Sequence, residues 1–234
     1  MTGVPSSRMS RDWFPTVEAN IDYRFMTCAT LGPCVEIGDE LAISMEFDTS
    51  RTELYNDFMA MDEENTANGS DRKLVTWLPE YRVPILLIAL GDDCTAVYIQ
   101  SKKQMFYASD MISLPAGVPA GTILIANYTE DLTVDNVRVP RVLVYDVATW
   151  GLSEKKHVFE DFRSIAPAAR YKLLRKEFEK LLRASPNKTI ILQWVGFVEG
   201  ALKFTTGEIP VGHSVSSMVY MGINATCPVR IINA

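Results

Sequence analysis

The sequence predicts an α+β protein that is rich in antiparallel sheet and has one long amphipathic helix. Short apolar runs separated by tight turns fill residues 83–108, which is typical of an antiparallel meander, and two more strand-like runs follow by residue 147. Residues 166–184 instead place their apolar side chains at helical spacing. The composition, 47% hydrophobic and 22% charged, is sufficient for a packed core, and 234 residues suit one large or two small domains.

Three units are predicted along the chain. Residues 1–20 contain scattered Pro and Ser and are expected to form a flexible lead. Residues 21–71 are expected to form a small α/β element, and residues 72–234 the main domain.

The small element is expected to begin with short strands and to continue with a helix. Apolar residues at spacings of three and four predict a helix over residues 49–61, with Thr49 or Ser50 as the N-cap. Residues 62–71 are acidic and rich in turn-forming residues, so they are expected to be an exposed loop.

The main domain is expected to begin with a meander of strands over residues 83–108, which a connector and two more strands follow. The predicted strands are residues 83–90, 95–100, 105–108, 122–128 and 141–147. Residues 114–121 (LPAGVPAG) are expected to be a Pro/Gly connector, and an acidic turn is expected around Glu130 and Asp131. Further strands are predicted at residues 189–197, 201–205 and 218–221.

The predicted helix, residues 166–184, has Pro167 near its start and Pro186 just beyond its end. Its apolar stripe comprises Tyr171, Leu174, Phe178, Leu181 and Leu182. The remaining positions carry the cations Arg170, Lys172, Arg175, Lys176, Lys180 and Arg183. These could face phosphates, but a solvated helix face partly balanced by Glu177 and Glu179 is the interpretation that the sequence favours.

Charge and composition exclude several functions. A net charge of −6 and a pI near 5.1 argue against a protein that coats nucleic acid, and no DNA partner is expected. The longest apolar run is far shorter than the roughly 18–20 residues of a membrane span. No cofactor or metal is expected, because the four cysteines (Cys28, Cys34, Cys94, Cys227) form no CxxC pair.

Nothing at the N-terminus resembles a secretory signal, and the cysteines are interpreted as free thiols, so an intracellular location, nuclear or cytoplasmic, is expected. The chain has no phosphate-binding P-loop and no convincing catalytic triad. Its two histidines, His157 and His213, are expected to be surface residues.

Two segments carry a family resemblance: LVYDV, which contains Asp146, and VEGALKF, which contains Glu199 and Lys203. With the strand pattern, they resemble the adenylation or guanylation domain of DNA ligases, RNA ligases and mRNA capping enzymes. The resemblance implies a nucleotidyltransferase-like (ATP-grasp-type ligase/capping) fold. The family's Lys-x-Asp-Gly motif is absent, and the first strand ends in IALGDD. Because the lysine amine is the family's nucleophile, a degenerate relative without catalysis is expected.

The segment YDVATWG (145–151) is more specifically similar to the snurportin-like cap-binding domain, a degenerate branch of this family. The stretch EGALKFTTGEIPVGHSVSSMVYM (199–221) and the pair Trp77-Leu78 extend the resemblance over residues 74–221. Residues 1–70 lack the basic helix with which that family binds an import receptor.

The resemblance implies roles for particular residues. Trp150 would stack on the cap base, and Trp77 would support the next nucleotide. Lys102, with its neighbour Lys103, would lie near the phosphate bridge. Asp146, Glu199 and Lys203 complete the expected ligand-binding set. For Trp150 the alternative is a core tryptophan that closes the sheet edge.

The sequence therefore predicts non-catalytic binding of a capped RNA 5′ end or a guanine nucleotide. The alternative is a structural subunit that binds proteins in a ribonucleoprotein or RNA-processing complex and takes no nucleotide. A third reading, an active transferase that uses Lys102 or Lys103 as a displaced nucleophile, is disfavoured.

Overall fold

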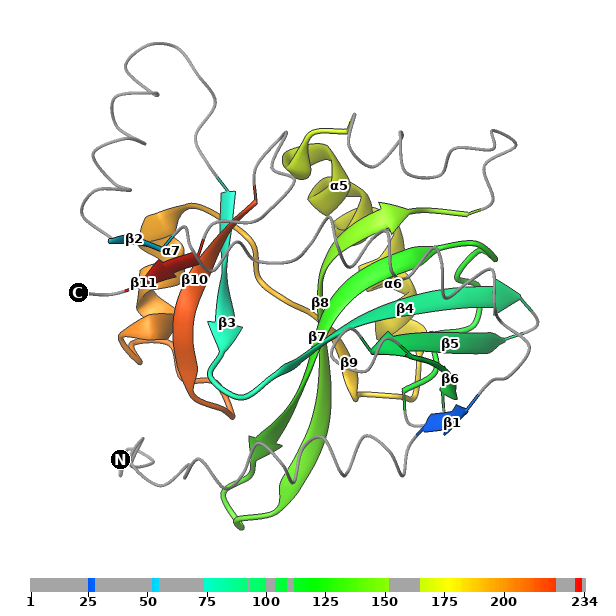
Figure 1. Ribbon diagram of the computed structural model, residues 1–234, viewed down its shortest axis with the longest axis horizontal. Coiled ribbons are helices and arrows are strands. Elements are labelled where there is room, and N and C mark those ends of the chain that lie inside the picture. The colour runs from blue at the N-terminus through cyan, green and yellow to red at the C-terminus, as the bar shows by residue number, and fades with distance from the viewer. Residues whose placement is uncertain are drawn as a thin grey trace.

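The computed structural model describes residues 25–27, 52–54, 74–91, 93–99, 104–108, 112–151, 165–221 and 230–232. They form a mixed α and β fold whose sheets are mostly antiparallel, which confirms the coarse class predicted from the sequence. Figure 1 shows a larger and a smaller sheet side by side, with one helix beside the larger sheet and a shorter helix at the smaller.

The larger sheet has seven strands in the described chain. In spatial order they are β1 (Phe25–Thr27), β6 (Gln104–Ala108), β5 (Cys94–Ile99), β4 (Val83–Gly91), β7 (Ile123–Leu132), β8 (Arg138–Thr149) and β9 (Ile190–Leu192). Every neighbouring pair is antiparallel except β8 and β9. The meander predicted over residues 83–108 is confirmed in β4, β5 and β6, but the next strand, β7, pairs with β4 and not with β6.

Both faces of this sheet are buried, which explains why β4 is an almost continuous apolar run. Because side chains alternate along a strand, Ile85 and Leu87 point to one face and Leu86 and Ile88 to the other. The first face, here called the helix face, packs against Leu174 and Phe178. The opposite face packs against residues that include Leu74 and Val195, which lie next to the smaller sheet.

The long helix is confirmed. It runs without a break through α5 (Pro167–Leu173), a π-helical segment η3 (Leu174–Phe178) and α6 (Glu179–Ala184). Pro167 occupies the first turn, where the missing N–H costs nothing. Ser185 is extended, as a residue before proline prefers, and this ends the helix.

The smaller sheet has four strands in the order β2 (Thr52–Leu54), β11 (Arg230–Ile232), β10 (Val215–Met221) and β3 (Leu74–Pro79). Helix α7 (Val198–Thr205) packs against β3 and β10. Through β1 and β2, residues from the predicted unit 21–71 pair with β6 and β11. The predicted division into three units stays a prediction.

The helix predicted over residues 49–61 is wrong for the three residues that the structure describes there. Thr52–Leu54 is strand β2, which pairs in parallel with β11. Strand pairing across almost the whole chain length overrides the local helical spacing here. The rest of that segment lies outside the described residues.

The strand predicted over residues 201–205 is also wrong, because this stretch belongs to helix α7. Ala201 is fully buried and the next residue, Leu202, is partly buried. Neighbouring residues can share one side of a helix, whereas in a strand they point to opposite faces. The strand predicted over 189–197 is shorter than expected. After β9 the chain leaves the larger sheet, and Gly196 then bridges to Val75 of β3.

The acidic turn predicted around Glu130 and Asp131 is displaced. Both residues lie within β7, and the hairpin turns farther on, where the Thr133 amide donates to the Val137 carbonyl at 3.0 Å. Asn136 takes a positive φ of 58° in this turn, a conformation that Asn tolerates. Figure 1 shows the β7–β8 hairpin reaching well beyond the rest of the sheet.

Candidate functional site

Trp150 lies directly after β8, where three segments meet. The Gly121 amide donates to the Ala89 carbonyl at 2.7 Å, which ties the Pro/Gly connector (114–121) to the end of β4. The Gly151 amide donates to Thr122 Oγ1 at 3.0 Å, which ties the end of β8 to the same connector. Gly151 has a φ of +82°, so the turn after Trp150 suits glycine.

The Trp150 side chain is half-buried and packs against the helix-face core. Its ring meets Phe178 of η3 edge to face, with centroids 6.4 Å apart and planes at 78°. This geometry is favourable for an aromatic pair. The indole is therefore held by the long helix from one side and is not enclosed in the interior.

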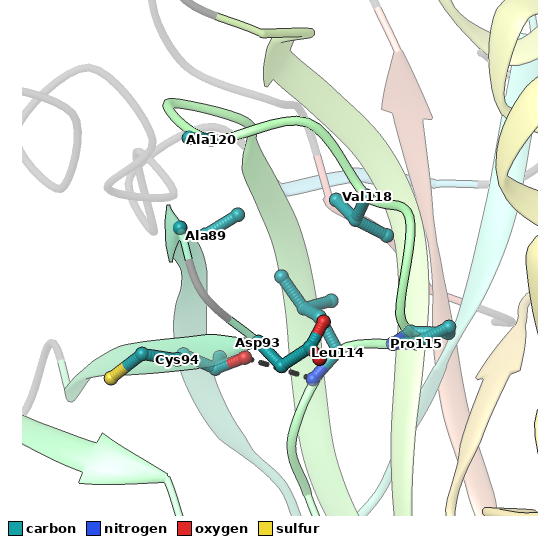
Figure 2. A pocket seen from close by; sticks show the side chains of 9 residues that line it. Ala89, Asp93, Cys94, Leu114, Pro115, Val118 and Ala120 are labelled. Atoms are coloured by element: carbon teal, nitrogen blue, oxygen red, sulfur yellow. Dashed lines mark hydrogen bonds between the residues drawn. The ribbon is translucent and has the colours of Figure 1, made fainter.

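A cavity of about 370 Å³ opens where β4, β5 and the connector come together (Figure 2). Its lining comprises Ala89, Gly91, Asp93, Cys94, Thr95, Leu114, Pro115, Val118 and Ala120. The Leu114 amide donates to Thr95 Oγ1 at 2.9 Å, which fixes the connector to the start of β5. Trp150 does not line the cavity, but Gly151, the next residue, lies against Pro119 of the connector.

The charge of this lining is unusual for a nucleotide site. Asp93 is the only charged residue among the described residues that line it, and it is exposed and held at a positive φ of 58°. None of these described residues is a lysine or an arginine, so they offer no cation to balance a phosphate. Cys94 adds a half-exposed free thiol.

Asp146 of β8 makes a buried ion pair with Arg170 of α5. Its two carboxylate oxygens accept from Arg170 Nε and Nη2, both at 2.9 Å, and Oδ1 also accepts from the Val147 amide at 2.8 Å. Burial raises the pKa of Asp146, while the Arg170 guanidinium and the Val147 N–H act against that rise. Burial likewise raises the pKa of the neighbouring Tyr145. The structure thus places Asp146 in a link between β8 and the long helix.

Trp77 lies in a different part of the molecule. It belongs to β3 and is only 4% exposed, with its ring 5.0 Å from that of His213 and 5.7 Å from that of Phe204. Its indole N–H has no hydrogen-bond partner in the described part of the chain. Its carbonyl accepts a hydrogen bond from Gln193 Nε2.

His213 is not the surface residue that the sequence predicted, because its side chain is only 4% exposed. Its Nδ1 lies 2.7 Å from Asp131 Oδ1, and Arg141 Nε donates to the other oxygen of Asp131 at 2.7 Å. Burial raises the pKa of Asp131, but the hydrogen bonds and charges of His213 and Arg141 outweigh it and lower the pKa below its usual 3.8. His157 lies outside the described residues.

The remaining predicted site residues do not gather around Trp150. Glu199 and Lys203 lie on α7 at the smaller sheet, and Lys203 Nζ is 3.7 Å from a Glu208 oxygen. Lys102 and Lys103 lie outside the described residues. The structure brings Trp77 together with α7, whereas Trp150 and Asp146, although both belong to the last part of β8 and the residue after it, contact different residues of the long helix.

Sequence reasoning overlooked the cavity beside the connector. The repeated Pro-Ala-Gly pattern of residues 114–121 marks an irregular segment, but it does not show that this segment stands away from β4 and β5. Within the described ranges, no group of His, Cys, Asp or Glu side chains is placed to hold a metal. Nor does any helix in those ranges have the length and apolar character needed to cross a membrane.

No known protein-family model matches this chain, and no curated protein does so either.

Proposed function

We propose that the protein binds a capped RNA 5′ end or a guanine nucleotide, without catalysing transfer, in a degenerate nucleotidyltransferase-like domain. The proposal rests on one observation: a half-exposed tryptophan, Trp150, at the edge of a connector that walls a cavity of about 370 Å³. That volume is in the range of small-molecule sites. A flat base stacked on the indole could extend over Pro119 toward the cavity.

The charge of the cavity favours a particular kind of base. A guanine methylated at N7 carries a positive charge, which both an indole face and a nearby carboxylate attract. Asp93 provides that carboxylate, and no cation stands beside it among the lining residues that the structure describes. The phosphates of the same ligand would then lie outside the cavity.

The absence of transfer is supported by the end of β4. The residues there are Ala89, Leu90 and Gly91. The position at which the ligases and capping enzymes carry their nucleophilic lysine therefore holds no side-chain amine. Incubation with α-labelled GTP or ATP, followed by denaturing electrophoresis, should show no labelled protein. A labelled band that disappears in the Lys102→Ala or Lys103→Ala variant would establish the transferase instead.

Isothermal titration with 7-methylguanosine triphosphate, a trimethylguanosine cap analogue and GTP tests the binding. Trp150→Ala should weaken binding of the methylated ligands about 5- to 100-fold, the value of one lost stacking contact. Phe197→Ala, which removes an exposed aromatic ring elsewhere, is the matched control and should leave affinity unchanged. Equal affinities in wild type and Trp150→Ala would contradict the proposal.

A protein-binding subunit without a nucleotide ligand is the second candidate, and the β7–β8 hairpin favours it. Val134 and Val137 at its turn are 94% and 56% exposed, and Figure 1 shows this turn projecting from the molecule. Exposed apolar side chains at a projecting tip are suited to contacts with another protein. Loss of co-purifying proteins in Val134→Ser/Val137→Ser, with no response to cap analogues, would favour this candidate.

A further inference from the structure

The outward side of the long helix has an uncommon composition. Its exposed residues are Ala168, Ala169, Lys172, Arg175, Lys176, Lys180, Arg183 and Ala184. Each of them is either a cation or an alanine. We call the five cations, Lys172, Arg175, Lys176, Lys180 and Arg183, the basic face.

The two acidic residues of the helix do not neutralise this face. Glu179 is half-buried and pairs with both Arg175 and Arg183, at 3.2 and 2.8 Å. Glu177 is also half-buried and lies 3.1 Å from Lys176. Two anions thus stand against five cations. In the described part of the chain, no carboxylate pairs with Lys172 or Lys180.

The excess of positive charge on this helix is local, since the chain as a whole carries a net charge of −6. The sequence favoured a solvated face that Glu177 and Glu179 partly balance. The structure changes that interpretation, because both glutamates are less exposed than the cations with which they pair. A concentrated positive surface on an acidic protein indicates an anionic partner.

The spacing of the cations suits a chain of phosphates. Lys172, Lys176 and Lys180 follow one another at intervals of four residues, which is about 6 Å along a helix axis. Neighbouring phosphates of an extended nucleic-acid strand are separated by a similar distance. The exposed alanines at both helix ends do not obstruct a strand that lies along this surface.

The lack of an apolar anchor argues for a nucleic-acid backbone over an acidic protein. Protein interfaces place aromatic or aliphatic side chains at their centre and contain few lysines. The outward side of this helix offers no apolar side chain larger than alanine. Phosphate contacts need only cations, and released counterions drive them.

The helix is also directly connected to the candidate site. Phe178 contacts the Trp150 ring, and Leu181 lies close to Gly117 of the connector. An RNA whose cap base stacks on Trp150 would therefore leave the site beside this helix. We propose that the basic face binds the phosphodiester backbone of the single-stranded RNA that follows the 5′ end. The identity of the polyanion rests on the proposed function.

Anisotropy of a labelled, uncapped 12-nucleotide RNA, titrated with the full chain at several salt concentrations, tests this surface. Lys172→Ala/Lys180→Ala breaks no ion pair of the described structure and should weaken binding about 10-fold. The slope of log affinity against log salt should fall by about 1.4, or about 0.7 for each lost phosphate contact.

The charge-preserving variant Lys172→Arg/Lys180→Arg should bind like wild type. So should Arg138→Ala, which removes one exposed cation on another element. Equal affinities for the alanine and arginine doubles would overturn the proposal. Polyglutamate that displaces the RNA equally well at matched charge would assign the surface to an acidic protein and overturn the RNA assignment.

Cap analogues keep this test separate from that of the proposed function. The alanine double should bind a cap nucleotide normally, and Trp150→Ala should bind the uncapped RNA normally. RNA binding that depends on the basic face, without any binding of a cap nucleotide, would refute the proposed function and leave this inference standing.

Discussion

Trp77 and Trp150 were both expected to support a base, and the structure places them in opposite environments. Trp77 is 4% exposed in the smaller sheet, beside the hydrogen-bonded His213 and Asp131. Trp150 is partly buried after β8 and touches one aromatic ring, that of Phe178. The second indole thus keeps some exposed surface for a ligand, whereas the first is covered.

The two regions are also held together differently. The side chains of Arg141, Asp131 and His213 form a hydrogen-bonded chain beside Trp77, which joins β7 and β8 to the loop before β10. In the other region one buried ion pair, Asp146 with Arg170, joins β8, the strand that precedes Trp150, to the helix. The comparison therefore predicts which substitutions damage the fold and which change only binding.

The largest effect is expected from Arg170→Ala, which leaves the Asp146 carboxylate buried without its partner. Such an uncompensated charge typically costs about 3–5 kcal/mol of unfolding free energy. Arg183→Ala, which removes an exposed pair with Glu179, should cost less than about 1 kcal/mol. Urea denaturation measures both. Similar losses in the two variants would show that the ion pair does not support the Trp150 region.

Replacing each tryptophan by alanine should lower the free energy of unfolding by clearly different amounts. Trp77→Ala should cost about 3–5 kcal/mol, because it leaves a large cavity in a packed region. Trp150→Ala should cost only about 1–2 kcal/mol, because its side chain is less buried than that of Trp77. Thermal unfolding checks the order.

Trp77→Phe refines this prediction. It should cost less than about 1 kcal/mol, because the change also removes an indole N–H that lacks a partner in the described part of the chain. A Trp150→Ala loss as large as that of Trp77→Ala would instead make Trp150 a core residue.

Acid should affect the Trp77 region through Asp131. Its pKa is lowered in the folded state from the usual 3.8, so the unfolded chain takes up this proton first as pH falls. The stabilising contribution is therefore present above about pH 4 and is lost as pH falls through the lowered folded pKa. Asp131→Asn should flatten the pH dependence of stability in this window, whereas the exposed Asp135→Asn should not.

The smallest effect is a change in labelling rate at the cavity. A maleimide should modify the half-exposed Cys94, and a methylated cap analogue should slow that modification several-fold. Mass spectrometry of the peptide that contains Cys94 follows the reaction, and Cys94→Ser provides the blank. If GTP slowed the modification of Cys94 as much as the methylated ligand does, Asp93 would not favour a positively charged base.

The sequence alone predicted the elements whose patterns are local and strong. Three features depend mainly on neighbouring residues, and the structure confirms them: the apolar run of β4, the antiparallel pairing of β4, β5 and β6, and the helical stripe from Tyr171 to Leu182. The short segments 52–54 and 201–205 could not be predicted in this way. Their conformation depends on pairing with β11 and packing on β3 and β10, which lie far away in the chain or across the sheet.

The candidate site divides in the same manner. YDVATWG drew attention to Trp150 and Asp146 from the sequence, and both lie at the end of β8. Only the tertiary structure showed that Asp146 forms an ion pair with Arg170 and that Trp77 is buried. It also showed that every exposed residue of the helix is a cation or an alanine. Periodicity states which side of an element is apolar, but burial and pairing depend on what other segments bring to that side.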